Sequence, residues 1–139
     1  MTSTPEVLVR RWFEEVWNRG NAAAIDQLLS MDAKVFGLSP DGKPLIGREA
    51  FKPFYQQFRT GFPNLRVTID QVVREQDLVA VHCHVTGTHT GEMLGKAPTH
   101  RSVSFTGICI VRTKGDQLVE GWNAFDFLSC FQQIGFNLQ

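Results

Sequence analysis

The stretch VEGWNAFD, residues 119–126, brings a carboxamide and two carboxylates together near the end of the chain. A carboxylate in a dry pocket can move protons, because burial raises its pKa toward neutral. The stretch alternates like a β-strand, so Asn123 and Asp126 project from opposite faces. Asp126 can act as a pocket acid/base, or it can cap a following helix from the N-cap position, where Asp is favoured. Asn123 cannot accept a proton at neutral pH but can orient a bound molecule.

His82 and His84 stand two residues apart in another strand-like run, so both rings project from one face. A pair of this kind can chelate a metal, but a catalytic zinc needs a third ligand, and the spacing supplies none. We therefore expect no metal site. The valines at 79, 81 and 85 direct the odd-numbered face to the core, which leaves His84 facing outward or at a subunit contact; a proton shuttle is its alternative role.

Small residues gather beside Asn123 on the predicted sheet. If residues 114–116 form a three-residue turn, Gly107 lies opposite Asn123 and Cys109 lies opposite Gly121. Small residues ringed by apolar ones predict a ligand pocket with one polar group, although the glycines can also serve only to relieve crowding where the sheet bends. Together with residues of the capping helices, the predicted ligand-binding set is Phe105, Gly107, Cys109, Gly121, Phe125, Trp12, Phe54 and Phe58.

The elements that must position these residues follow from periodicity. Helical spacing is seen at residues 5–19, 22–30 and about 48–60, and a short strand-like piece lies at 34–38. Period-two runs occupy residues 65–73, 78–89, 103–112 and 118–127. This order predicts one α+β domain over residues 1–139. Its three N-terminal helices pack on the concave side of a curved, cone-shaped antiparallel sheet.

Composition excludes several classes of function. Lys+Arg and Asp+Glu balance at 14 each, so no net charge draws the chain to nucleic acid or to an anionic membrane. No apolar run approaches the roughly 18 residues of a spanning helix, and the polar start is not a signal peptide. We expect a cytoplasmic protein. The three cysteines lack a close pair, which argues against disulfides and metal knuckles; no cofactor is expected.

The segment from Gly87 to Asp126, followed by FQQIG, resembles the SnoaL-like polyketide cyclase family of the NTF2-like superfamily. The motifs are G-T-H-x-G, A-P-T-x-R and E-x-W-x-x-x-D, and the match spans nearly the whole chain. His100 departs from the pattern, since many relatives have Gly there. The resemblance implies a cone-shaped barrel, a deep apolar pocket and a homodimer formed by sheet faces. It also implies ring closure in aromatic polyketide esters by an intramolecular aldol reaction.

The resemblance places the family's acid/base Asp at Asn123, and its His and Gln partners at Cys109 and Gly107, so all three differ here. Three hypotheses stay open. The first is a cyclase that acts through an enolate, in which Asn123 holds a carbonyl while His84 or Asp126 moves the proton. The second is a non-catalytic binder of a small apolar or aromatic ligand. The third is another NTF2-like enzyme, such as a ketosteroid isomerase or an epoxide hydrolase; the isomerase needs a Tyr, and the single Tyr lies on a predicted helix.

Overall fold

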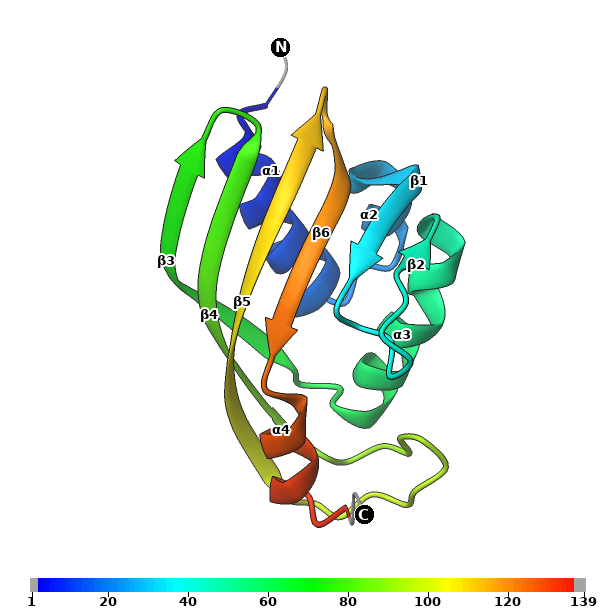
Figure 1. The fold of residues 1–139 in the computed structure, drawn as a ribbon. Coiled ribbons are helices and arrows are strands. Elements are labelled where there is room, and N and C mark those ends of the chain that lie inside the picture. The colour runs from blue at the N-terminus through cyan, green and yellow to red at the C-terminus, as the bar shows by residue number, and fades with distance from the viewer. Residues whose placement is uncertain (1–2, 137–139) are drawn as a thin grey trace.

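The computed structural model describes residues 3–136 and shows one curved sheet wrapped around helices (Figure 1). Six strands follow the order β2-β1-β6-β5-β4-β3 across the sheet. Their bounds are β1 Leu29–Phe36, β2 Leu45–Ile46, β3 Arg66–Glu75, β4 Leu78–Thr88, β5 Ser102–Lys114 and β6 Gln117–Phe125. The helices are α1 Pro5–Arg11, η1 Trp12–Asn18, α2 Ala23–Leu28, α3 Arg48–Gly61 and α4 Phe127–Gln133. Within the described chain, no helix has the length and apolarity needed to cross a membrane.

The predicted α+β class is confirmed, but the sheet is not antiparallel throughout. Strands β3 to β6 form the expected antiparallel meander. Strand β1 instead pairs with β6 in parallel, with Val35 beside Gly121 and Phe36 beside Trp122. Alternation identifies a strand but not its neighbour, and β1 and β6 are separated in sequence by α3 and four strands. The parallel pairing therefore left no local signal.

The register between β5 and β6 differs from the prediction by two residues. The turn contains only Gly115 and Asp116, and an irregularity after Leu118 then restores the odd-with-odd pairing. Cys109 consequently lies opposite Asn123, not opposite Gly121. The tight turn suits Gly115, whose φ of 61° is strained for residues with a side chain. From Gly121 to Phe125 the odd-numbered residues share the inward face as predicted, whereas their cross-strand partners differ from the prediction, and at the irregularity Leu118 takes the inward place predicted for Val119.

The N-terminal helix begins as predicted and then widens. The side chain of Thr4 accepts a hydrogen bond from the N–H of Val7, and Pro5 fills the first helical position. From Trp12 the helix follows a π register, seen in the bond from the N–H of Arg19 to the carbonyl oxygen of Glu14. This wider register brings residues five apart closer to one face than an α-helix does. It therefore lets Trp12 and Trp17 line the same cavity.

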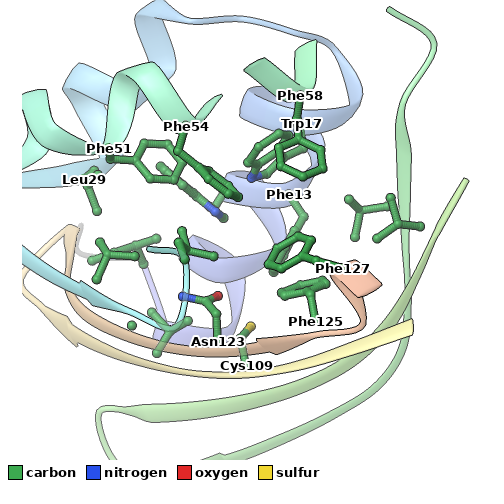
Figure 2. A pocket seen from close by; sticks show the side chains of 18 of the residues that line it. Phe13, Trp17, Leu29, Phe51, Phe54, Phe58, Cys109, Asn123, Phe125 and Phe127 are labelled. Atoms are coloured by element: carbon green, nitrogen blue, oxygen red, sulfur yellow. The ribbon is translucent and has the colours of Figure 1, made fainter. Parts of the chain in front are cut away.

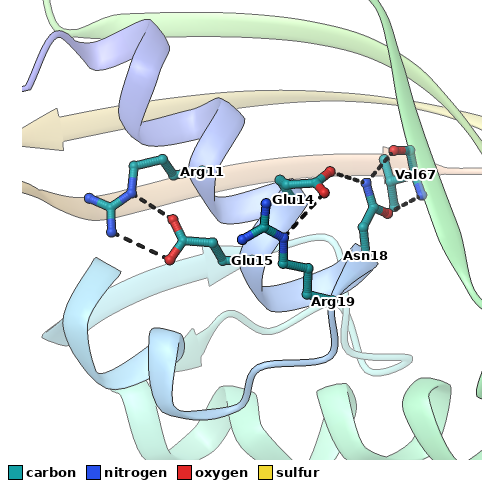
Figure 3. A network of polar contacts seen from close by, with 6 residues as sticks. All are labelled: Arg11, Glu14, Glu15, Asn18, Arg19 and Val67. Atoms are coloured by element: carbon teal, nitrogen blue, oxygen red, sulfur yellow. Dashed lines mark hydrogen bonds and ion pairs between the residues drawn. The ribbon is translucent and has the colours of Figure 1, made fainter.

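Asn18 attaches this helix to the edge strand β3 (Figure 3). Its Oδ1 accepts from the N–H of Val67 at 2.6 Å, and its Nδ2 donates to the carbonyl oxygen of the same residue at 3.0 Å. The side chain thus satisfies edge-strand backbone groups as another strand would. Nδ2 also donates to Glu14 at 3.0 Å, and Glu14 pairs with Arg19. The contact fixes the helix over the inner face of the sheet.

Helix α3 matches its predicted bounds to within a residue and supplies the second helical wall. Phe51, Phe54, Tyr55 and Phe58 recur at helical spacing and all belong to, or pack against, the core. The hydroxyl of Tyr55 donates to the carbonyl oxygen of Val16 at 2.9 Å, which ties α3 to η1. Burial raises the pKa of this phenol, so Tyr55 is a neutral structural donor.

Candidate functional site

A cavity lies between the inner face of the sheet and the helices η1 and α3 (Figure 2). The empty space between the lining atoms, including the open mouth, is about 780 Å³. The lining is overwhelmingly apolar. Such a hollow is typical of sites that bury most of a small organic molecule.

Aromatic rings form most of the helical wall and one end of the cavity. On α3, the ring centroids of Phe54 and Phe58 lie 5.0 Å apart. Phe127, at the start of α4, approaches them at 5.9 and 5.4 Å, respectively. Phe125 at the end of β6 stacks on Phe127 at 5.9 Å. Offset and tilted contacts at these distances stabilise the cluster and leave ring faces for a flat, apolar ligand.

Asn123 stands on the sheet floor opposite Cys109. Its Nδ2 donates a hydrogen bond of 3.0 Å to the carbonyl oxygen of Phe36, at the end of β1. Among the hydrogen bonds of residues 3–136, the Asn123 side chain makes this one alone, through Nδ2, and no protein group donates to Oδ1. The carboxamide therefore links β6 to β1 through its Nδ2, and its Oδ1 remains available as a hydrogen-bond acceptor.

The remaining chemical groups at the floor are not reactive bases or nucleophiles. Burial raises the pKa of the Cys109 thiol to about 12, so it is neutral at physiological pH and does not act as a thiolate. Glu120 is the single carboxylate among the described lining residues. Its Oε1 accepts from Arg112 Nε at 3.1 Å, and the same guanidinium also pairs with Asp77.

Of the predicted ligand-binding residues, Gly107 does not line this cavity. It lies opposite Phe125, and a Cβ on Gly107 would overlap the Phe125 ring. The space that the glycine leaves is thus filled from the neighbouring strand. The other residues predicted to bind ligand do line the cavity, and Asn123 lines it with them: Trp12, Phe54, Phe58, Phe105, Cys109, Gly121 and Phe125. Gly121 leaves real space, since a Cβ there would approach only Asn123 Nδ2, at 3.8 Å.

Asp126 is not in the cavity, contrary to the acid/base prediction. It is exposed and caps α4, with Oδ1 accepting from the N–H of Ser129 at 3.0 Å. The helix-capping alternative is therefore what the structure shows. Asp126 and His82 border a separate, shallower hollow that is not part of the aromatic cavity. The even-numbered parity of Asp126 along the strand explains this placement.

His84 also lies away from the cavity, so it cannot shuttle protons there. Its Nδ1 is 2.9 Å from an oxygen of Asp70. Asp70 is the extra residue at an irregularity in β3, between the pairs Ile69–Cys83 and Gln71–His82, which directs its side chain to His84. No cluster of three possible metal-ligating His, Cys, Asp or Glu side chains occurs in residues 3–136.

Several lining residues escaped the sequence reasoning. Phe127 was assigned to the end of a strand-like run, yet its odd-numbered position after Phe125 was a usable signal. Leu118 faces inward because the irregularity after it reverses the alternation, which no local pattern reveals. Leu29 and Val35 come from β1, whose parallel pairing was not predicted. All four belong to the cavity wall.

A curved sheet and the helices packed on its inner face enclose an apolar cavity, and this architecture defines an NTF2-like α+β protein. Residues 7–134 match the model of the SnoaL-like polyketide cyclase family, and the chain belongs to that family. This confirms the resemblance inferred from the motifs. No curated protein matches the chain.

Solved structures agree with this assignment. IdmH from Streptomyces antibioticus, a candidate polyketide cyclase, is 27% identical, with a TM-score of 0.82 over 96% of this chain and 100% of that chain. A SnoaL-like protein from Jannaschia sp. is 23% identical, with a TM-score of 0.85 over 98% and 94% of the two chains. AclR from Streptomyces galilaeus, a candidate hydroxylase, is 23% identical, with a TM-score of 0.82 over 97% and 83%. The last two likenesses concern the fold alone.

Proposed function

We propose that this protein binds a small apolar, aromatic molecule in the cone cavity. The observation that carries the proposal is a cavity walled by aromatic rings, with the Asn123 carboxamide on its floor and no free acid or base among the described lining residues. Flat apolar ligands gain from burial against such rings. A single polar group is enough to orient a ligand in a dry site.

Ring closure in an aromatic polyketide-like substrate is the second candidate, favoured by membership of the family. Aldol chemistry needs a base that removes a proton beside a carbonyl and a donor that stabilises the enolate. Asn123 is not a base, and Asp126 and His84 lie outside the cavity. Glu120 is the one carboxylate among the described lining residues that could act as the base, but it is already paired with Arg112. An isomerase is less favoured still, because the Tyr55 hydroxyl is already bonded to Val16.

The outer face of the sheet supports a homodimer. Ile108 and Ile110 on β5 are 53% and 42% exposed, and Trp122 on β6 stacks on Phe36 beside them at 5.8 Å. Exposed apolar side chains grouped on one face are typical of a contact surface. The balance of 14 basic and 14 acidic residues gives no net repulsion between two copies. We propose that a second copy of this chain covers this face.

Thermal unfolding with a ligand panel tests the binding function. The panel contains anthraquinone-like methyl esters, steroids and long-chain ketones. A compound at a hundred times its dissociation constant should stabilise the fold by about 2.7 kcal/mol. Gly121→Leu should abolish the shift, since its side chain enters the cavity, whereas Gly42→Ala at an open turn should not. Product formation from an ester hit would favour the cyclase, and no shift with any class would contradict the proposal.

A further inference from the structure

We infer that Asn123 makes the cavity select ligands that bring a hydrogen-bond donor to the sheet floor, such as a phenolic or enolic hydroxyl. The same skeleton with only an ether or ketone oxygen there would bind less well. This inference rests on the proposed binding function and adds the chemical class of the ligand. It also reverses the role expected from the sequence, in which Asn123 holds a carbonyl.

The orientation of the carboxamide follows from its bond to β1. Asn123 Nδ2 lies 3.0 Å from the carbonyl oxygen of Phe36. Turning the amide over would set Oδ1 against that oxygen, and two acceptors would face each other without a hydrogen. The amide nitrogen must therefore face β1, which leaves Oδ1 facing away from β1 as an available hydrogen-bond acceptor.

The backbone around this bond cannot easily move away. Gly37 has a φ of 88°, and a Cβ built on it would overlap the backbone carbonyl of Asn123. The two chain segments thus approach as closely as glycine permits. Phe36 is also held by its parallel pairing with Trp122 and by the stacking of the two rings. The carbonyl that orients the amide is consequently a fixed part of the sheet.

The apolar surroundings of Oδ1 increase the free-energy difference between ligands that donate a hydrogen bond to it and ligands that do not. The carboxamide rises from the sheet into the space below the helical rings (Figure 2). Within the described chain no protein group donates to Oδ1. When a ligand displaces water from an apolar cavity, an acceptor without a donor costs free energy, while an acceptor matched by a hydroxyl does not. A second acceptor brought to the same place would also be repelled.

Three probes of one skeleton test this inference: naphthol, its methyl ether and acetylnaphthalene, all substituted at the same ring carbon. Their affinities for the full chain are measured by titration calorimetry. We expect naphthol to bind about three- to tenfold more tightly than either of the other two, as one neutral hydrogen bond allows. Asn123→Leu should remove the preference by weakening naphthol alone. Gly42→Ala, at an open turn outside the cavity lining, should retain it.

The outcomes separate the inference from the proposed function. Equal affinities in the unmodified chain, or tighter binding of acetylnaphthalene, would overturn the donor preference but leave the binding function standing. Failure of all three probes to bind would overturn both. The comparison in the unmodified chain decides the question even if Asn123→Leu does not fold. A preference that persists in a folded Asn123→Leu variant would show that another group is responsible, which also overturns the inference.

Discussion

The ring of Phe125 occupies the place that a side chain on Gly107 would need. The two residues face each other across β5 and β6, and a Cβ on Gly107 would overlap atoms Cδ1, Cε1 and Cγ of the ring. The glycine therefore gives Phe125 its position, and Phe125 in turn supports Phe127 at the end of the cavity. Gly107 shapes the site without touching it.

Replacing Gly107 by Ala should accordingly destabilise the fold by about 1–3 kcal/mol, since an added methyl group in a filled space forces neighbours to shift. Chemical denaturation measures the change. Gly121→Ala is the matched control, because its Cβ meets nothing nearer than 3.8 Å and should alter stability by less than about 1 kcal/mol. Equal losses in the two variants would contradict the role assigned to Phe125.

Asn123→Asp should make stability depend on pH. A neutral carboxyl can donate to the Phe36 carbonyl in place of Nδ2, whereas a carboxylate would be repelled by it in an apolar cavity. The folded-state pKa should therefore exceed the unfolded value of about 3.9. Stability is then fully present below about pH 4 and falls by up to roughly 1.4 kcal/mol per pH unit as pH rises toward the folded-state pKa. Denaturation of both proteins from pH 4 to 8 checks this; a constant difference between them would refute it.

Because His89 resists protonation in the folded chain, the free energy of unfolding should fall in mildly acidic solution. It is fully buried, its Nδ1 accepts from the N–H of Thr99 at 3.1 Å, and its Nε2 has no partner in the described chain. Burial and, second, His100 lower its pKa. The unfolded chain takes up a proton near pH 6.5 and the folded chain resists it. The free energy of unfolding should thus be level above about pH 7.5 and decline as pH falls below about 6.5 toward the folded-state pKa.

His89→Asn isolates this contribution. The amide oxygen can still accept from Thr99, but the side chain does not titrate. The variant should be less stable at neutral pH because it leaves a void. Its loss of stability between about pH 7 and 5 should be smaller than that of the unmodified chain. Identical slopes in denaturation series would exclude His89 as the titrating group.

His100 carries backbone strain in a left-handed conformation. Its φ is 60°, a left-handed conformation that costs residues with a side chain roughly 1 kcal/mol relative to Gly. His100→Gly should therefore raise the free energy of unfolding by up to about 1 kcal/mol. Gly115→Ala is the reverse change, at a φ of 61° with nothing within 4 Å, and should lower it by a similar amount. Urea denaturation of both variants gives the comparison.

Ile108→Glu should separate the proposed homodimer. The substitution places a charge on the exposed apolar face, where a second copy would have to bury it. Sedimentation should show a dimer for the unmodified chain and a monomer for this variant. Leu128→Glu, at a residue 56% exposed on α4, is the control and should remain dimeric. A monomer in the unmodified chain at high concentration would rule out the proposed contact.

Much of this architecture was readable from local patterns. Alternation placed Phe105, Cys109, Gly121 and Asn123 on the inward face, and helical spacing placed Phe54 among the rings above them. These are properties of short segments, since the side-chain direction repeats every two residues in a strand and every 3.6 in a helix. The Asp126 cap is local in the same sense, because donor and acceptor lie three residues apart.

What lies across from each of these residues was decided only by the tertiary structure. A turn of two residues and an irregularity near Val119 moved Cys109 opposite Asn123 and brought Phe125 over Gly107. The orientation of the Asn123 amide depends on a carbonyl 87 residues away in the chain, on a strand whose parallel pairing leaves no local pattern. Sequence alternation determines most of the side chains that enter the cavity, Leu118 at the irregularity excepted. Register and long-range backbone contacts determine which atoms they present there, because these depend on how distant segments meet.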